Sequence, residues 1–331
     1  MIHRAADEHP GSVPEHRRGA LAQPLSLVYA ERETGPLHMD LYRPAGERLA
    51  PVVLFMHGGG WFTGDRTLAP DLRRYFADRG IAMASIDYRL SHHAIFPAQL
   101  HDVRSAVRYL RSRAGELGLD GGNIGLWGAS AGGHLAAIAG LTGGQPSLAG
   151  EPVTDDSHIA VRVQVVVESY GPTDLLDENV PPGAGLPGMP PEESPTARLL
   201  GGLPELHLDR ARAASPLSHI TPDAPPFQIS HGTSDQLVPH PHSELLHAAL
   251  VNAGAYSELY LVHDFRHGFL NPPSRGDVNT DTVLDSGRLD AAGLTTATYR
   301  TAPDASAESD TTFGFDTIGD FLVRHLIEGA S

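Results

Sequence analysis

The residues that most clearly indicate catalytic chemistry lie at positions 128–132, where the sequence reads Gly-Ala-Ser-Ala-Gly. A serine with a glycine two positions away on each side, between a strand-like run and a helical pattern, is typical of a nucleophile elbow. Such a sharp turn forces strained backbone angles on the serine, and small neighbours let the strand and helix approach closely. Ser130 is therefore predicted to be a nucleophile, held at the positive end of the following helix.

A second motif, His-Gly-Gly-Gly at positions 57–60, follows another strand-like run. Consecutive glycines leave backbone N–H groups open to close approach by a substrate oxygen, as an oxyanion hole requires. We expect the amides of Gly59, Gly60 and Ala131 to be its donors. A phosphate-binding loop is not supported, because neither of the usual glycine spacings is present. Trp61, the next residue, is expected either to line the substrate pocket or to have a purely structural role.

Two further polar residues, Asp235 and His267, each follow a strand-like run later in the chain. The order Ser130, Asp235, His267 is expected for α/β-hydrolases and differs from the other two common orders of serine proteases. In this scheme His267 takes the serine proton and delivers it to the leaving alcohol, while Asp235 fixes the imidazole tautomer. Taken alone, Asp235 could equally cap the following helix or make a turn. His263 competes as the base, but it is expected to belong to the strand.

These motifs occur in order with Asp-Tyr-Arg-Leu-Ser at 87–91, Phe-Pro-Ala-Gln at 96–99 and Tyr-Gly-Pro-Thr-Asp at 170–174. The set resembles the hormone-sensitive-lipase-like esterases of the α/β-hydrolase superfamily. It is most similar to the branch that holds carboxylesterases, acetyl-xylan and feruloyl esterases and kynurenine-formamidase-like amidases. The resemblance covers residues 25–267 and the C-terminal helix. It implies a metal-free serine hydrolase that works through an acyl-enzyme, without implying which ester is cleaved.

The composition limits the classes of partner. The chain has 24 basic and 40 acidic residues, a formal net charge of −16, and no cysteine. This balance argues against nucleic acid and anionic membrane surfaces, and the missing cysteines exclude disulfides and a thiol nucleophile. The first residues lack an apolar core of signal-peptide length, and no run approaches the roughly 18 apolar residues of a membrane span. We therefore expect a cytoplasmic enzyme that acts on a small-molecule ester.

The 19 histidines raise the question of a metal site. Some of these histidines form three clusters, at 92–93, 240–242 and 263–267. None has the His-Glu-x-x-His spacing that places two ligands on one helix face. We expect neither a metal nor another cofactor.

Strand-like runs alternate with helical patterns along the chain. The expected strands are 25–30, 37–41, 52–56, 81–86, 124–127, 161–167, 227–230 and 257–262. The expected helices are 71–79, 98–113, 134–141, 240–253 and 313–327. This alternation predicts an α/β-hydrolase fold, with a mostly parallel eight-stranded sheet covered by helices on both faces.

The domain organisation is predicted to be simple. Residues 1–24 are polar and are expected to form a loose N-terminal arm, followed by a single domain at 25–331. Residues 172–224 are rich in proline and glycine and are expected to form a small cap insertion over the site. Residues 271–312 are polar and allow two interpretations, a disordered surface excursion or a lid or homodimer contact.

The residues favour a serine carboxylesterase that cleaves small-to-medium acyl esters through an acyl-enzyme, since the expected cap is not strongly apolar. The same machinery would serve an arylformamidase, another amidase or a lactone hydrolase, and an alcohol or amine could intercept the acyl group. A binding protein on a catalytically silent hydrolase scaffold is the alternative from another class. Such proteins typically lose a triad member, whereas this chain retains all three.

Overall fold

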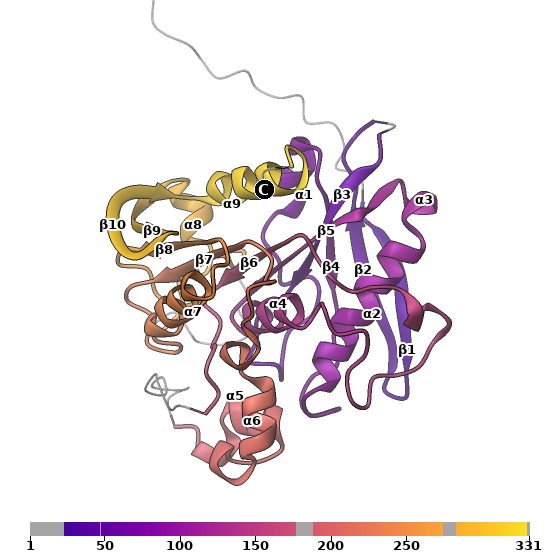
Figure 1. The fold of residues 1–331 in the computed structure, drawn as a ribbon, viewed down its shortest axis with the longest axis horizontal. Helices are drawn as coiled ribbons and strands as arrows, with labels where there is room; N and C mark the ends of the chain where they lie inside the picture. The colour runs from indigo at the N-terminus through magenta and orange to yellow at the C-terminus, as the bar shows by residue number, and fades with distance from the viewer. Residues whose placement is uncertain (1–22, 47, 177–187, 274–282, 330–331) are drawn as a thin grey trace, which may run out of the picture.

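The computed structural model describes residues 23–46, 48–176, 188–273 and 283–329. These residues form one sheet with the strand order β1-β2-β4-β3-β5-β6-β7-β8-β9-β10 (Figure 1). The strands are β1 Leu25–Arg32, β2 Gly35–Tyr42, β3 Ala50–Met56, β4 Ala82–Ile86, β5 Leu119–Ala129, β6 Val165–Ser169, β7 Phe227–Gly232, β8 Ser257–Val262, β9 Thr295–Thr301 and β10 Asp304–Phe313.

The helices are α1 Leu72–Phe76, α2 Ala98–Ser112, α3 Ala114–Leu117, α4 Ala131–Leu141, α5 Pro195–Leu200, α6 Leu208–Ala214, α7 Pro241–Asn252, α8 Arg288–Ala292 and α9 Phe315–Leu326. Five short 3₁₀ turns are η1 Ala77–Arg79, η2 Asp155–His158, η3 Pro191–Glu193, η4 Pro204–Leu206 and η5 Pro216–His219. Within the described ranges, no helix is long and apolar enough to cross a bilayer.

The middle of the sheet is parallel. Strands β4, β3, β5, β6, β7 and β8 pair in parallel, whereas β1, β2, β9 and β10 are joined by antiparallel pairs. The carboxyl ends of the parallel strands therefore meet at one edge of the sheet, where open α/β sheets bind their ligands. This arrangement confirms the predicted α/β-hydrolase fold.

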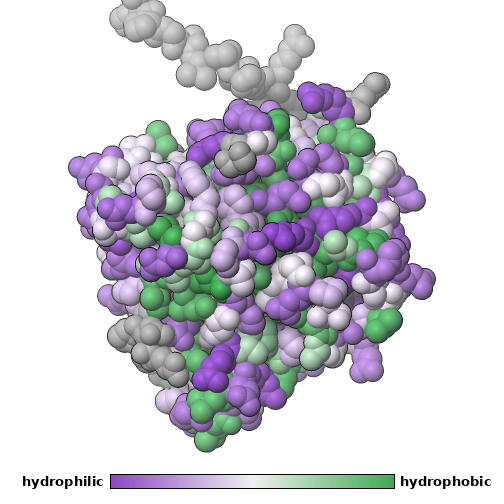
Figure 2. All heavy atoms as spheres, viewed as in Figure 1, coloured by the Kyte–Doolittle hydropathy of each residue, from purple (hydrophilic) through white to green (hydrophobic). Residues whose placement is uncertain are grey.

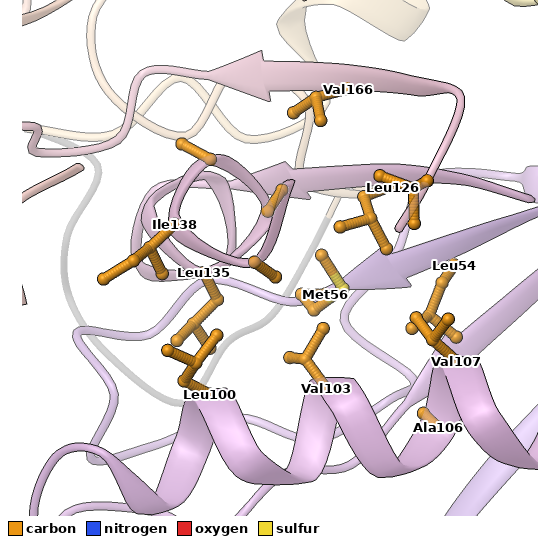
Figure 3. Close-up of a cluster of buried hydrophobic side chains, with 14 of the residues drawn as sticks. Leu54, Met56, Leu100, Val103, Ala106, Val107, Leu126, Leu135, Ile138 and Val166 are labelled. Carbon is orange, nitrogen blue, oxygen red and sulfur yellow. The ribbon is translucent and has the colours of Figure 1, made fainter. Parts of the chain in front are cut away.

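Two apolar cores lie on opposite faces of the sheet, and strand β3 contributes side chains to both. Val52, Leu54 and Met56 face the core covered by α2, α4 and α7, whereas Val53 and Phe55 face the core covered by α1, α8 and α9 (Figure 1). Figure 3 shows the first core, in which β3, β5 and β6 meet α2 and α4. Fully buried strands of this kind read as continuous apolar runs.

The predicted strand number was wrong, since the sheet of the described residues has ten strands rather than eight. The two additional strands, β9 and β10, lie within the polar segment 271–312. For these two strands, the interpretation as a disordered surface excursion was wrong. Residues 274–282 of the same segment lie outside the described residues. β10 is mostly exposed and carries few apolar residues, so its sequence lacks the alternation that marks a half-buried strand.

The predicted cap segment, 172–224, holds α5, α6, η3, η4 and η5 in its described part. Helices α5 and α6 project from the lower side of the molecule in the view of Figure 1. Apolar atoms reach the surface at this lower tip in Figure 2, and Leu206 and Leu208 are among the exposed large apolar residues. Residues 177–187 and most of the predicted N-terminal arm lie outside the described residues.

Candidate active site

Ser130 occupies the turn between β5 and α4. Its φ of 56° and ψ of −120° are strained for a residue with a side chain, and its amide is anchored to the carbonyl of Ser169 (2.8 Å). The flanking glycines are needed for close approach of the backbone. A Cβ on Gly128 would lie 2.0 Å from the carbonyl oxygen of Gly132, and one on Gly132 would lie 2.0 Å from that of Met56. The sequence therefore holds the Ser130 hydroxyl at the carboxyl edge of the sheet.

The structure brings together the three residues predicted to form a triad. Nε2 of His267 lies 2.7 Å from Oγ of Ser130, and Nδ1 of His267 lies 2.6 Å from Oδ2 of Asp235. Asp235 follows β7 and His267 follows β8, so the parallel pairing of these strands places both side chains at the same edge. His263 lies elsewhere, with its Nε2 2.9 Å from Oγ1 of Thr298 on β9.

Asp235 is buried and surrounded by donors. Its Oδ1 accepts from the amides of Leu237 (2.9 Å) and Val238 (3.0 Å), and its Oδ2 also lies 3.2 Å from Nε2 of His231. Burial alone would favour the neutral acid, but His267 and His231 outweigh it and hold the pKa of Asp235 well below its usual range. Asp235 is therefore a carboxylate at neutral pH and can stabilise a positive charge on His267.

The glycine loop at 57–60 lies beside the serine, because a Cβ on Gly58 would be 3.3 Å from the Cβ of Ser130. Gly59 and Gly60 have φ values of 110° and 58°. In the described part of the chain, no hydrogen bond uses the amides of Gly59 or Gly60. Ala131 begins α4, and amides of a first helical turn have no intrahelical acceptor. All three predicted donors are therefore available to a substrate oxygen.

The position of Trp61 fits the structural role, one of the two expected for it. Its side chain is buried, and its indole N–H donates to Nδ1 of His134 (3.2 Å). Nε2 of His134 in turn lies 2.7 Å from the carbonyl of Ala214 at the end of α6. Burial lowers the pKa of His134 to about 4, so the neutral ring accepts from Trp61 and donates to Ala214. This row connects the glycine loop, α4 and the cap segment.

The cap segment also borders the glycine loop directly. A Cβ on Gly60 would lie 3.1 Å from the Cβ of Pro195, the first residue of α5, and 2.8 Å from the ring of Phe62. The guanidinium of Arg198 on α5 stands 5.3 Å from the Phe62 ring centroid and forms an ion pair with Glu193. The predicted cap therefore adjoins the predicted oxyanion hole.

Sequence reasoning missed three buried residues behind Asp235. Nδ1 of His231 lies 2.7 Å from Oγ of Ser243 on α7, and this hydroxyl lies 3.4 Å from Oε2 of Glu168 on β6. All three side chains are fully buried. One available signal was the single acid in the otherwise apolar run of β6, because an ionisable residue in a buried strand requires a partner.

The histidine clusters at 92–93 and 240–242 are not part of the triad. His92 and His93 contact each other with ring centroids 4.0 Å apart, and His240 lies 3.0 Å from a carboxylate oxygen of Glu244. No group of three or more candidate ligands is placed to hold a metal ion among the residues that the structure describes.

Comparisons with known proteins point in one direction. Residues 39–250 match the family model of BD-FAE. Esterase LipC of Mycobacterium tuberculosis is 35% identical over 192 residues, which are 57% of this chain and 45% of LipC. Esterase LipQ of the same organism is 33% identical over 256 residues, 75% of this chain and 58% of LipQ. The chain thus spans about half the length of these curated relatives.

A solved structure of similar size is esterase Est2 of the planctomycete Thermogutta terrifontis. It is 26% identical with a TM-score of 0.67, and the match covers 94% of this chain and 96% of Est2. The chain and this esterase therefore share nearly their whole fold.

Proposed function

The chain belongs to the BD-FAE family of hormone-sensitive-lipase-like α/β-hydrolases, and on that premise we propose that it is a serine carboxylesterase. The observation that carries this proposal is the hydrogen-bonded row Ser130–His267–Asp235 beside the glycine loop. This row holds the nucleophile, the general base and the orienting acid that acyl transfer requires, in contact with one another.

Acylation begins when Oγ of Ser130 attacks the ester carbonyl carbon. The serine proton passes to Nε2 of His267, and Asp235 stabilises the imidazolium through Nδ1–H. The carbonyl oxygen becomes an oxyanion that accepts from the amides of Gly59, Gly60 and Ala131. The tetrahedral intermediate then collapses, His267 gives its proton to the leaving alcohol, and an ester of Ser130 remains.

Deacylation repeats these steps with water as the nucleophile. His267 removes a proton from water, the hydroxide attacks the acyl carbon, and the same amides hold the second oxyanion. Collapse of this intermediate releases the carboxylic acid and returns the proton to Ser130.

We expect short acyl groups to be preferred. Solved structures of the related Est2 hold propionate and butyrate, which supports a site of that size. A series of p-nitrophenyl esters from acetate to decanoate should therefore give the highest kcat/KM at two to four carbons. Formanilide and lactone substrates tested beside them separate the esterase from the amidase and lactonase alternatives.

The first prediction concerns the nucleophile. Rapid mixing with p-nitrophenyl butyrate should give a burst of p-nitrophenol, because acylation with this activated ester releases the alcohol before the slower deacylation releases the acid. Ser130→Ala should abolish the burst and lower kcat by about 10⁶-fold.

His267→Ala should show a similar loss, whereas His263→Ala is the matched control and should retain wild-type kcat. Equal activity in wild type and Ser130→Ala would refute the assignment of the nucleophile.

A further inference from the structure

The hydrogen-bonded row does not end at Asp235. From Oδ2 of Asp235, the oxygen that also faces His267, it continues through His231 and Ser243 to Glu168, which come from β7, α7 and β6. Each of these three side chains is fully buried. A buried chain of polar groups is retained at a free-energy cost unless every member has a partner. The geometry therefore raises the question of what this extension does for Asp235.

The proton on His231 is located by its neighbours. Nε2 faces the carbonyl of Val238 (2.8 Å) and the carboxylate of Asp235 (3.2 Å), and both of these oxygens only accept. Nε2 therefore carries a proton, and in a neutral ring Nδ1 is the acceptor. The group that Nδ1 faces is the hydroxyl of Ser243, at 2.7 Å.

The proton on Glu168 is located in the same way. Its Oε1 accepts from the amide of Gly171, so a proton on this carboxyl group lies on Oε2, which faces Ser243. The Ser243 hydroxyl donates to Oε2 when Glu168 is a carboxylate. With the protonated acid this bond reverses, and the Ser243 hydroxyl donates to Nδ1 of His231 instead. In this arrangement every donor of the row is directed toward Asp235, and no member lacks a partner.

We propose that Glu168 is a positioning residue that acts through Ser243 and His231 on Asp235, and that this row is intact only while the Glu168 carboxyl group carries its proton. The inference rests on the proposed esterase function, because its effect is read through Asp235 and His267. If Glu168 loses its proton, the hydroxyl of Ser243 turns toward the new carboxylate. His231 then loses the donor at Nδ1, and Asp235 loses the fixed orientation of one of its partners.

The environment of Glu168 fits this role. Burial raises the pKa of the Glu168 carboxyl group to about 8, against the opposing contributions of the Gly171 amide and Ser243. The carboxyl group is therefore neutral through the ordinary working range of pH. The other titratable groups facing the row are Tyr170 on the loop after β6, His242 on α7 and His267. Asp174 in turn interacts with His242.

The test compares the pH dependence of kcat/KM in wild type and Glu168→Gln, with p-nitrophenyl butyrate and subtraction of the uncatalysed rate. Glutamine places a carbonyl oxygen at Gly171 and an N–H donor at Ser243, so it imitates the protonated acid at every pH. We expect wild-type kcat/KM to fall about tenfold as the pH rises from 7 to 9, the effect of losing the hydrogen bond from Ser243 to His231. Glu168→Gln should match wild type at pH 7 and keep its plateau through pH 9.

A second variant keeps the proposal testable if Glu168→Gln fails to fold. Ser243→Ala cuts the row and should lower kcat about tenfold already at pH 7, with KM within twofold of wild type and no alkaline bend. The matched control is Ser230→Ala, since the hydroxyl of this buried serine on β7 donates to Oγ of Ser169 and lies outside the row. It should retain both the wild-type kcat and the alkaline bend.

The two proposals fail separately. Identical profiles for wild type, Glu168→Gln and Ser243→Ala would overturn the role of Glu168 while the burst of the wild type still supports the esterase. Activity that survives Ser130→Ala would overturn the esterase mechanism itself.

Discussion

Individual atoms of Asp235 explain much of the site. Its two carboxylate oxygens accept from four groups: two backbone amides on one oxygen, and His267 and His231 on the other. A carboxylate group held by four donors cannot rotate. We therefore expect it to fix the tautomer and orientation of His267 before substrate binds. We propose that Asp235 fixes the imidazole tautomer, and through the amides of Leu237 and Val238 it also holds the turn after β7.

A prediction follows at this residue. Asp235→Asn presents either an N–H or a carbonyl to His267 at nearly unchanged volume, and the imidazole then adopts the wrong tautomer for accepting the serine proton. We expect kcat for p-nitrophenyl butyrate to fall about 10⁴-fold, as in other serine triads. Circular dichroism and a denaturation curve establish that the variant is folded, and a loss below tenfold would contradict the assigned role.

Among the elements, the one that connects most of the site is α4. It begins at the serine, carries His134 as the acceptor of Trp61, and reaches the cap segment through the carbonyl of Ala214. The glycine loop is therefore held from two sides, by α4 and by Pro195 of α5. Displacement of either element would move the predicted oxyanion donors.

Gly60→Ala tests this element-scale coupling. The added methyl group would meet Phe62 and Pro195, and the φ of 58° is unfavourable for alanine, so the loop must shift. We expect kcat to fall about 10²-fold with KM within threefold, the effect of losing one oxyanion donor.

The matched control is Gly35→Ala in the β1–β2 hairpin. Gly35 has a φ of 112°, and an added methyl group would meet no atom within 4 Å, so it carries backbone strain alone. It should lower stability but leave kcat unchanged. A similar kcat in both variants would show that the loop does not depend on this glycine.

The sequence predicted the elements that carry continuous apolar runs, such as β3, β5 and β8, together with the motifs that follow them. It did not predict β9 and β10, because their polar residues show no alternation and their pairing depends on the neighbouring β8. For the same reason the contacts among His231, Ser243 and Glu168 were not predicted. They are far apart in sequence, and only the parallel register of β6 and β7 and the packing of α7 bring them together.

At the scale of the whole molecule, Glu168 links stability to pH. In the unfolded chain this carboxyl group has its ordinary pKa of 4.5, whereas in the folded protein its pKa is about 8. Between these values the folded state holds a proton that the unfolded state has lost. The contribution of Glu168 to the free energy of unfolding is therefore complete below pH 4.5 and lost progressively as the pH rises to 8.

This linkage can be measured by urea unfolding at pH 5, 6.5 and 8. The difference in unfolding free energy between wild type and Glu168→Gln should change steadily in favour of the variant as the pH rises, because glutamine does not titrate. Parallel curves for the two proteins would contradict the raised pKa.

The edge strand β10 affects how two copies of this chain can associate. β10 pairs with β9 alone in the described part of the sheet, and it carries the carboxylates of Asp304, Glu308 and Asp310. Unpaired strand edges invite growth of a sheet from one molecule into the next, which leads to aggregation. Two such edges brought together would place like charges opposite one another on chains that already carry −16 each. We therefore expect the acidic residues of β10 to disfavour aggregation through this edge of the sheet.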